Sequence, residues 1–111
     1  MNNIKIFRAN RGEGKTKWLF ERAAEEQLNG KYLYYVGTEK TMKTLVEMWE
    51  ATFHEKCPIV DWSESSDIIR PCCIFTDGLF DNLYDMSLWF NFMKRYDATW
   101  YITANKEYFV N

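Results

Sequence analysis

The sequence predicts an α/β protein, a three-layer αβα domain around a mainly parallel sheet of four to five strands. Short apolar runs typical of strands alternate along the chain with helical patterns, and parallel strands need such crossover segments. A glycine-containing loop joins the first expected strand to the first expected helix. The chain has 111 residues, 47% apolar and 27% charged, which favours a single folded domain over residues 1–111.

The first strand and the first helix are expected near the start of the chain. Residues 3–8 alternate polar and apolar side chains, with β-branched and aromatic members, as a strand does. A helix is expected over residues 15–28, with Leu19 and Leu28 in its apolar stripe. The turn residues Asn29-Gly30 then end this helix.

A second strand and a second helix follow. Residues 32–36 are a nearly continuous apolar run, which suits a strand covered on both faces. Thr38 is the expected N-cap of the next helix. The apolar residues of that helix recur at helical spacing as Met42, Leu45, Val46, Trp49 and Phe53.

The second half of the chain contains three further strand patterns. Residues 59–60 are expected to form a short strand, and residues 72–75 a buried strand that is followed by Asp77. Residues 79–96 carry apolar side chains at helical spacing, and residues 100–102 form the last expected strand.

The composition argues against several classes of protein. The net charge is −2, so a protein that coats nucleic acid is not indicated. The chain lacks 18 consecutive apolar residues, and no membrane association is expected. The three cysteines are odd in number and include the adjacent pair Cys72-Cys73, which is not a disulfide framework. A reducing cytoplasm is therefore the expected compartment.

The segment from Ala9 to Thr16 predicts a phosphate-binding loop. Its glycines let backbone N–H groups turn toward a phosphate, and the helix that follows adds unpaired N–H groups and its positive dipole end. Lys15 is expected to reach the terminal phosphates, and Thr16 to hold Mg²⁺ through its hydroxyl. The alternative is a basic, glycine-containing turn that only caps a helix. The expected nucleotide-binding residues of the loop are Asn10, Arg11, Gly12, Glu13, Gly14, Lys15 and Thr16.

This segment resembles the Walker A motif of P-loop NTPases, although Ala9 stands where the usual pattern begins with Gly. The run from Arg11 to Thr16 is most similar to the Arg-x-x-Gly-Lys-Thr form in the ATPase domains of viral terminase large subunits. The resemblance implies a minimal P-loop NTPase-like domain with ATP and Mg²⁺ as ligands. It also implies catalytic roles for Lys15 and, close to the γ-phosphate, for Arg11. A solvated surface arginine is the alternative for Arg11.

Two later strand ends extend the resemblance. The run from Cys73 to Asp77 fits the Walker B pattern, which makes Asp77 a candidate for catalysis and for Mg²⁺ binding; a turn-forming Asp before Gly is the alternative. In the additional-strand branch of the family a Glu follows this Asp and activates water, but here Gly78 follows. The last strand is followed by Thr103 and Asn105, which resemble the polar tip that senses the γ-phosphate in that branch. Ordinary loop residues are the alternative.

Three functions stay open from the sequence alone. The favoured one is a small nucleotide-binding protein with weak or slow NTP hydrolysis, a reduced viral ATPase or packaging accessory in the host cytoplasm. The second is a non-catalytic interaction protein that keeps the fold as a scaffold and regulates a larger ATPase or host factor. The third is a nucleoside or nucleotide kinase. The expected partners are the nucleotide and either a larger protein or further copies of this chain.

Overall fold

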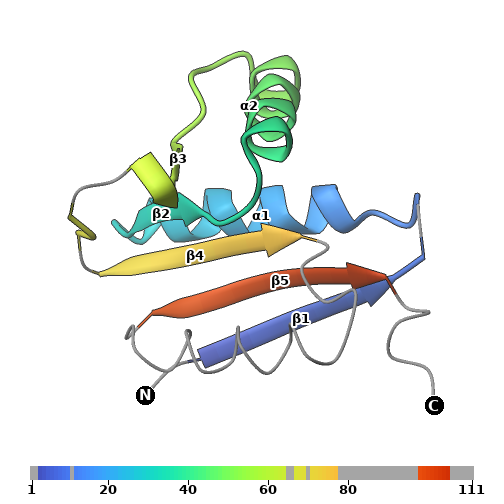
Figure 1. The fold of residues 1–111 in the computed structure, drawn as a ribbon, viewed down its shortest axis with the longest axis horizontal. Helices are drawn as coiled ribbons and strands as arrows, with labels where there is room; N and C mark the ends of the chain where they lie inside the picture. The colour runs from blue at the N-terminus through green and yellow to red at the C-terminus, as the bar shows by residue number, and fades with distance from the viewer. Residues whose placement is uncertain (1–2, 11, 65–66, 70, 78–97, 106–111) are drawn as a thin grey trace.

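The computed structural model describes residues 3–10, 12–64, 67–69, 71–77 and 98–105 of the chain. Within these ranges the chain alternates strands with helices, as the sequence predicts (Figure 1). The elements are β1 (Asn3–Ala9), α1 (Lys15–Leu28), β2 (Tyr32–Tyr35), α2 (Glu39–Phe53), β3 (Ile59–Asp61), the short 3-10 helix η1 (Trp62–Glu64), β4 (Cys72–Asp77) and β5 (Thr99–Asn105).

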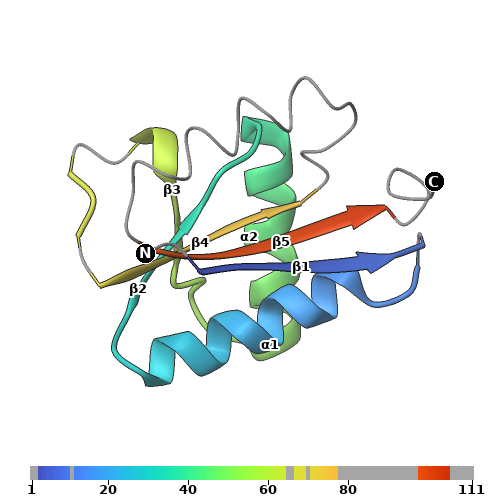
Figure 2. The same cartoon turned by 90° about the horizontal axis from the view of Figure 1, so that it is seen from below.

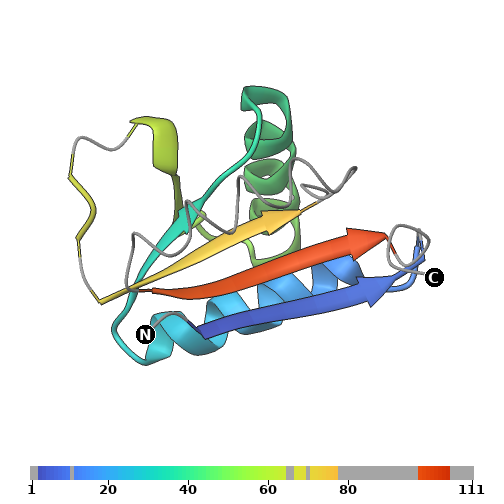
Figure 3. The same cartoon turned by 60° about the horizontal axis from the view of Figure 1, so that its bottom comes forward.

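The strands form one five-stranded sheet in the order β1-β5-β4-β2-β3, and every strand pair in it is parallel. The α/β fold class predicted from the sequence is therefore confirmed. Figure 3 shows β1, β5 and β4 running in the same direction. The last strand in the chain, β5, lies between the first strand and β4. The carboxyl ends of these three strands consequently meet at one edge of the sheet.

Both described helices pack on one face of the sheet. Leu19 of α1 and Trp49 of α2 belong to one buried cluster with Phe75 and Tyr101 of the sheet. Figure 2 shows α1 and α2 running in different directions along this layer. The expected helix over residues 79–96 lies outside the described residues.

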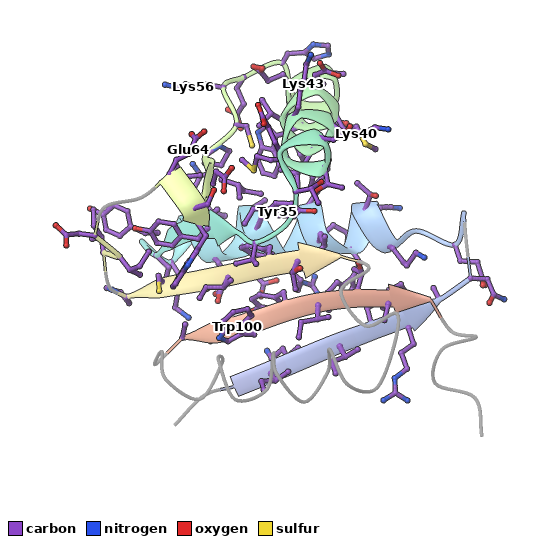
Figure 4. All side chains as sticks on the ribbon, viewed as in Figure 1. Tyr35, Lys40, Lys43, Lys56, Glu64 and Trp100 are labelled. Atoms are coloured by element: carbon purple, nitrogen blue, oxygen red, sulfur yellow. The ribbon has the colours of Figure 1, made fainter. Side chains whose placement is uncertain are left out.

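The opposite face of the sheet has its own apolar cluster. Its members come from alternate strand positions, so that Tyr35 faces the helices while Trp100 lies on the other side (Figure 4). The 3-10 helix contributes Trp62, which packs edge-on against Tyr34 with ring centroids 5.8 Å apart. Both faces of the central strands are thus buried, as their continuous apolar runs predict.

A chain of aromatic contacts holds the first half of α1 on the sheet. Trp18 stacks on Phe7 of β1 at 5.2 Å between ring centroids and meets Tyr101 of β5 edge-on at 5.8 Å. Tyr101 in turn stacks on Phe75 of β4 at 5.2 Å. These contacts tie the start of α1 to three neighbouring strands.

The predicted helix boundaries are confirmed. The Thr38 hydroxyl accepts a hydrogen bond from the Thr41 N–H at 3.1 Å, and the Thr38 N–H donates to the Thr41 hydroxyl at 2.9 Å. These reciprocal bonds form a capping box at the start of α2. Helix α1 ends at Leu28 with Asn29 as its C-cap residue, and Gly30 adopts a left-handed conformation with φ +77°.

Two details of the prediction are wrong. Leu28 is 89% exposed, because it follows Leu19 by about two and a half helical turns and lies on the opposite side of α1. Strand β5 runs from Thr99 to Asn105, so Thr103 and Asn105 belong to the strand and do not follow it. The parallel pairing with β1, in which Ala9 is the register partner of Asn105, extends the strand beyond its apolar run.

Candidate functional site

The loop between β1 and α1 depends on two glycines. Gly12 and Gly14 have φ angles of +82° and +88°, in the left-handed region that glycine enters without steric cost. A Cβ added at either position would meet nothing within 4 Å. The conformation of the backbone, and not lack of space, therefore requires glycine at these positions.

The N-terminus of α1 carries no side-chain cap. Gly14 is its N-cap residue and has no side chain to accept a hydrogen bond, and the first turn contains no acidic residue. Helix α2 differs, because Thr38 caps it. The positive end of the α1 dipole therefore lies at an N-terminus that no side chain caps, which suits an anion. Lys15 and Thr16, the first two residues of this helix, are half-buried.

Glu13 forms two hydrogen bonds with Asn10 inside the loop. The Asn10 N–H donates a hydrogen bond to Glu13 Oε1 at 2.7 Å, and the Glu13 N–H donates to the Asn10 carbonyl at 3.1 Å. A carboxylate oxygen of the chain itself thus accepts one of the loop N–H groups expected to contact phosphate. Glu13 and Asn10 lie in the loop as predicted, and they bind each other.

The structure brings the predicted strand-end residues to the same edge as the loop. Ala9 is the register partner of Asn105, and Asp77 is the register partner of Thr103. Neighbouring strands lie about 4.8 Å apart, so Asp77 lies roughly 10 Å from β1 across β5. Ligands of parallel α/β sheets bind at this carboxyl edge. The separate motifs along the sequence therefore converge in space.

The structure places two of the predicted residues only in part and one of them not at all. Arg11 lies outside the described residues. Asp77 and Asn105 are described as the last positions of β4 and β5, while their side chains lie outside the described part of the chain. Thr103 is 1% exposed and shares the helix-facing side of β5 with Tyr101.

Within the described ranges, no three His, Cys, Asp or Glu side chains group together to hold a metal ion. The Mg²⁺ site predicted here has a different donor set, because it uses a loop hydroxyl, one carboxylate, phosphate oxygens and water. Thr16 supplies the hydroxyl at the start of α1, and Asp77 ends the strand on which the carboxylate is expected. The Mg²⁺ site at these two residues stays a prediction.

A buried carboxylate lies at the other end of α1. Glu26 is 5% exposed and accepts hydrogen bonds from the Cys73 thiol at 2.8 Å and the Tyr101 hydroxyl at 3.2 Å. Lys31 Nζ and Asn29 Nδ2 donate to the same carboxylate at 3.0 and 3.2 Å. The sequence prediction missed this cluster, although Glu26 follows Leu19 and Ala23 at the helical spacing of the buried stripe.

The hydrogen bonds keep this carboxylate charged. Burial alone raises the pKa of Glu26, but the bonds from Cys73, Lys31 and Asn29 and the charge of Lys31 outweigh it, so that the pKa is about 2. Burial and the bond to Glu26 raise the pKa of the Cys73 thiol. Burial and the charge of Glu26 raise the pKa of Tyr101. Both groups therefore stay protonated and act as donors.

Comparison with protein-family models, with curated proteins and with solved structures finds no match to this chain. In the part of the chain that the structure describes, no helix is long and apolar enough to cross a membrane.

Proposed function

We propose that this chain is a small P-loop nucleotide-binding protein that binds ATP with Mg²⁺ at the loop from Ala9 to Thr16 and hydrolyses it weakly or slowly. The observation that carries the proposal is the uncapped N-terminus of α1, preceded by two glycines in the left-handed conformation. Backbone N–H groups and a helix dipole directed at one point form a site for phosphate.

The strand order supports the same function. The residues that end β4 and β5 are proposed to contact a nucleotide bound at the loop that follows β1. Here β5 lies between β1 and β4, and its last residue, Asn105, is the register partner of Ala9. The pairing brings the ends of β1, β4 and β5 to one edge of the sheet, and ligands of parallel α/β sheets bind at this edge.

Each residue has one task in the proposed site. The backbone of Gly12 and Gly14 surrounds the phosphates, Lys15 neutralises their charge, and Arg11 acts beside the γ-phosphate. Thr16 and Asp77 hold Mg²⁺, directly or through water. The nucleotide, when bound, supplies the phosphoryl group, while the chain positions it and stabilises its charge.

Hydrolysis is proposed to be slow because Gly78 follows Asp77 where a water-activating Glu is expected. Orienting the attacking water is a separate task from holding the phosphates. We assign the protein to a reducing cytoplasm, that of the host if the chain is viral. The cysteines Cys57, Cys72 and Cys73 form no disulfide, which supports this assignment.

The contact between Asn10 and Glu13 favours a second candidate function. The Glu13 carboxylate satisfies a loop amide in the absence of a nucleotide. The chain would then be a non-catalytic scaffold that acts on a larger protein partner or assembles with further copies of itself.

Calorimetric titration with ATP, with and without Mg²⁺, tests the proposal. We expect the wild type to bind and Lys15→Ala to bind at least about thirtyfold more weakly, which corresponds to about 2 kcal/mol for a lost charged partner. Lys43→Ala, which removes an exposed lysine of α2, is the matched control and should leave the affinity unchanged (Figure 4). A wild type that does not bind ATP would reject the proposal and favour the scaffold.

A further inference from the structure

A groove runs between α1 and α2 beside the phosphate loop. It consists of two cavities of about 390 and 350 Å³. Thr16 and Met48 line both cavities, so the two adjoin at these residues. Volumes of about 300–1,000 Å³ are typical of sites for small ligands.

One end of the groove is apolar and aromatic. Phe20 of α1 and Phe53 of α2 line it, with ring centroids 6.2 Å apart, and Met48 completes this end. Phe53 is 39% exposed and Met48 is 42% exposed, so both leave apolar surface open to solvent. A flat ring that covered this surface would gain the free energy of apolar burial.

Two hydroxyls in the lining of the groove suit a ligand that donates hydrogen bonds. The Thr44 hydroxyl donates to the Lys40 carbonyl at 3.1 Å, and the Thr52 hydroxyl donates to the Met48 carbonyl at 2.7 Å. Their hydrogens are therefore used within α2, and their oxygens offer lone pairs only. A ligand that satisfies these oxygens must carry O–H or N–H groups. The Lys40 ammonium, in the same lining as Thr44, complements a ligand oxygen.

The middle of the groove adjoins the proposed nucleotide site. Thr16 belongs both to the groove and to the proposed Mg²⁺ site. Thr16 would hold such an ion beside the terminal phosphates, so the groove would open next to them. A ligand in the groove thus lies next to the nucleotide and does not replace its phosphates.

From this lining we infer that the groove binds a nucleoside as a second ligand, with its base at Phe20 and Phe53 and its hydroxyl-bearing sugar toward Thr16 and Thr44. A nucleoside combines a flat ring with O–H and N–H groups that can donate to the Thr44 and Thr52 hydroxyl oxygens. The inference rests on the proposed function for the place of the phosphates, and on the groove alone for the second ligand.

Binding of four probes to the whole chain tests the inference. Thymidine, deoxycytidine, adenosine and guanosine are titrated separately and followed by ligand-observed NMR, first alone and then with saturating Mg²⁺ and ADP. We expect at least one nucleoside to bind in both conditions. If no probe binds at millimolar concentration, the inference fails. Displacement of the nucleoside by ADP would also overturn it, because the groove would then hold the base of the loop nucleotide.

Three variants locate the site. Met48→Trp fills the junction of the two cavities and should weaken nucleoside binding at least tenfold, whereas Glu47→Trp, at an exposed α2 position outside the lining, should not. Thr44→Val removes one acceptor and should weaken binding severalfold without filling the groove. Unchanged binding in both Met48→Trp and Thr44→Val would place the nucleoside elsewhere and reject the inference.

Lys15→Ala separates this inference from the proposed function. It should abolish most ATP binding while nucleoside binding persists. If the wild type binds a nucleoside but no ATP, the proposed ATP site at the loop is rejected and the nucleoside site in the groove is retained. If the wild type binds ATP but no nucleoside, the nucleoside site is rejected and the ATP site is retained.

Discussion

The Cys73 thiol lies 2.8 Å from Glu26 Oε2 and so joins β4 to the last turn of α1 inside the core. A thiol is a weak donor, but the low dielectric of this buried position strengthens its bond to a charged carboxylate. The hydroxyl of Tyr101, a residue of β5, donates a hydrogen bond to the same oxygen at 3.2 Å. One carboxylate therefore connects α1 to two strands of the sheet.

The first prediction is an acid-dependent loss of stability that depends on Glu26. Its pKa is about 2 in the folded chain and 4.5 ordinarily, so the unfolded chain binds a proton first as the pH falls. The contribution of the Glu26 carboxylate to the stability of the folded chain is fully present above about pH 5 and disappears between about pH 5 and pH 2. A shift of this size corresponds to about 3 kcal/mol in the free energy of unfolding.

Denaturant unfolding at pH 7 and pH 3 measures this effect in the wild type and in Glu26→Gln. The variant should be less stable at pH 7 and should lose less stability on acidification. Glu47→Gln, an exposed position of α2, is the control and should keep the difference between the two pH values seen in the wild type. Parallel pH profiles of the wild type and Glu26→Gln would contradict the assignment.

The second prediction concerns the backbone at Gly14. Gly14→Ala should lower the free energy of unfolding by about 1–2 kcal/mol, because a Cβ strains the left-handed conformation. Gly14→Asn should cost less, since Asn enters this conformation more readily. The melting temperatures of the two variants test this. Because a Cβ meets nothing within 4 Å here, equal losses would point to an effect other than strain.

The third prediction concerns Asp77 and Mg²⁺. Asp77→Asn removes the charge expected to hold Mg²⁺ and should weaken ATP binding in the presence of Mg²⁺ while leaving Mg²⁺-free binding nearly intact. Calorimetry in both conditions measures the two affinities. Equal weakening in both conditions would identify Asp77 as a structural residue at the end of β4.

The fourth prediction is slow turnover. Without a carboxylate at position 78, the purified chain should hydrolyse ATP more slowly than about 0.01 per second, against roughly 1–10³ per second for typical enzymes. Gly78→Glu should raise the rate in a phosphate-release assay. Robust turnover by the wild type would overturn the prediction. Asp81, Asp85 and Glu107 are acids that follow the two motif-bearing strands in the sequence. Loss of that turnover on replacing one of them would then identify it as the residue that activates water.

The local elements could be predicted because each leaves a periodic pattern in the chain. Strands β2 and β4 appear as apolar runs since both of their faces are buried. The capping box of α2 is local as well, because Thr38 and Thr41 lie three residues apart. The loop between β1 and α1, with its two glycines, is similarly contained in one continuous segment.

Features that join distant segments could not be predicted. The position of β5 between β1 and β4 depends on pairings such as Asn3 with Thr99, which no local pattern encodes. The burial of Glu26 depends on donors from β4 and β5, and charge alone suggests an exposed residue. The groove requires the side chains of two helices, so its lining is scattered along the sequence.

The place of β5 in the sheet has a consequence for the order in which the chain acquires its site. In the described sheet, β1 pairs with β5, so the strand that leads into the phosphate loop lacks this partner until residues 99–105 have been synthesised. Contacts between such distant segments slow folding, because a long loop must close before they form. A nascent chain stalled before β5 should therefore show no affinity for nucleotide, even though its loop residues are all present.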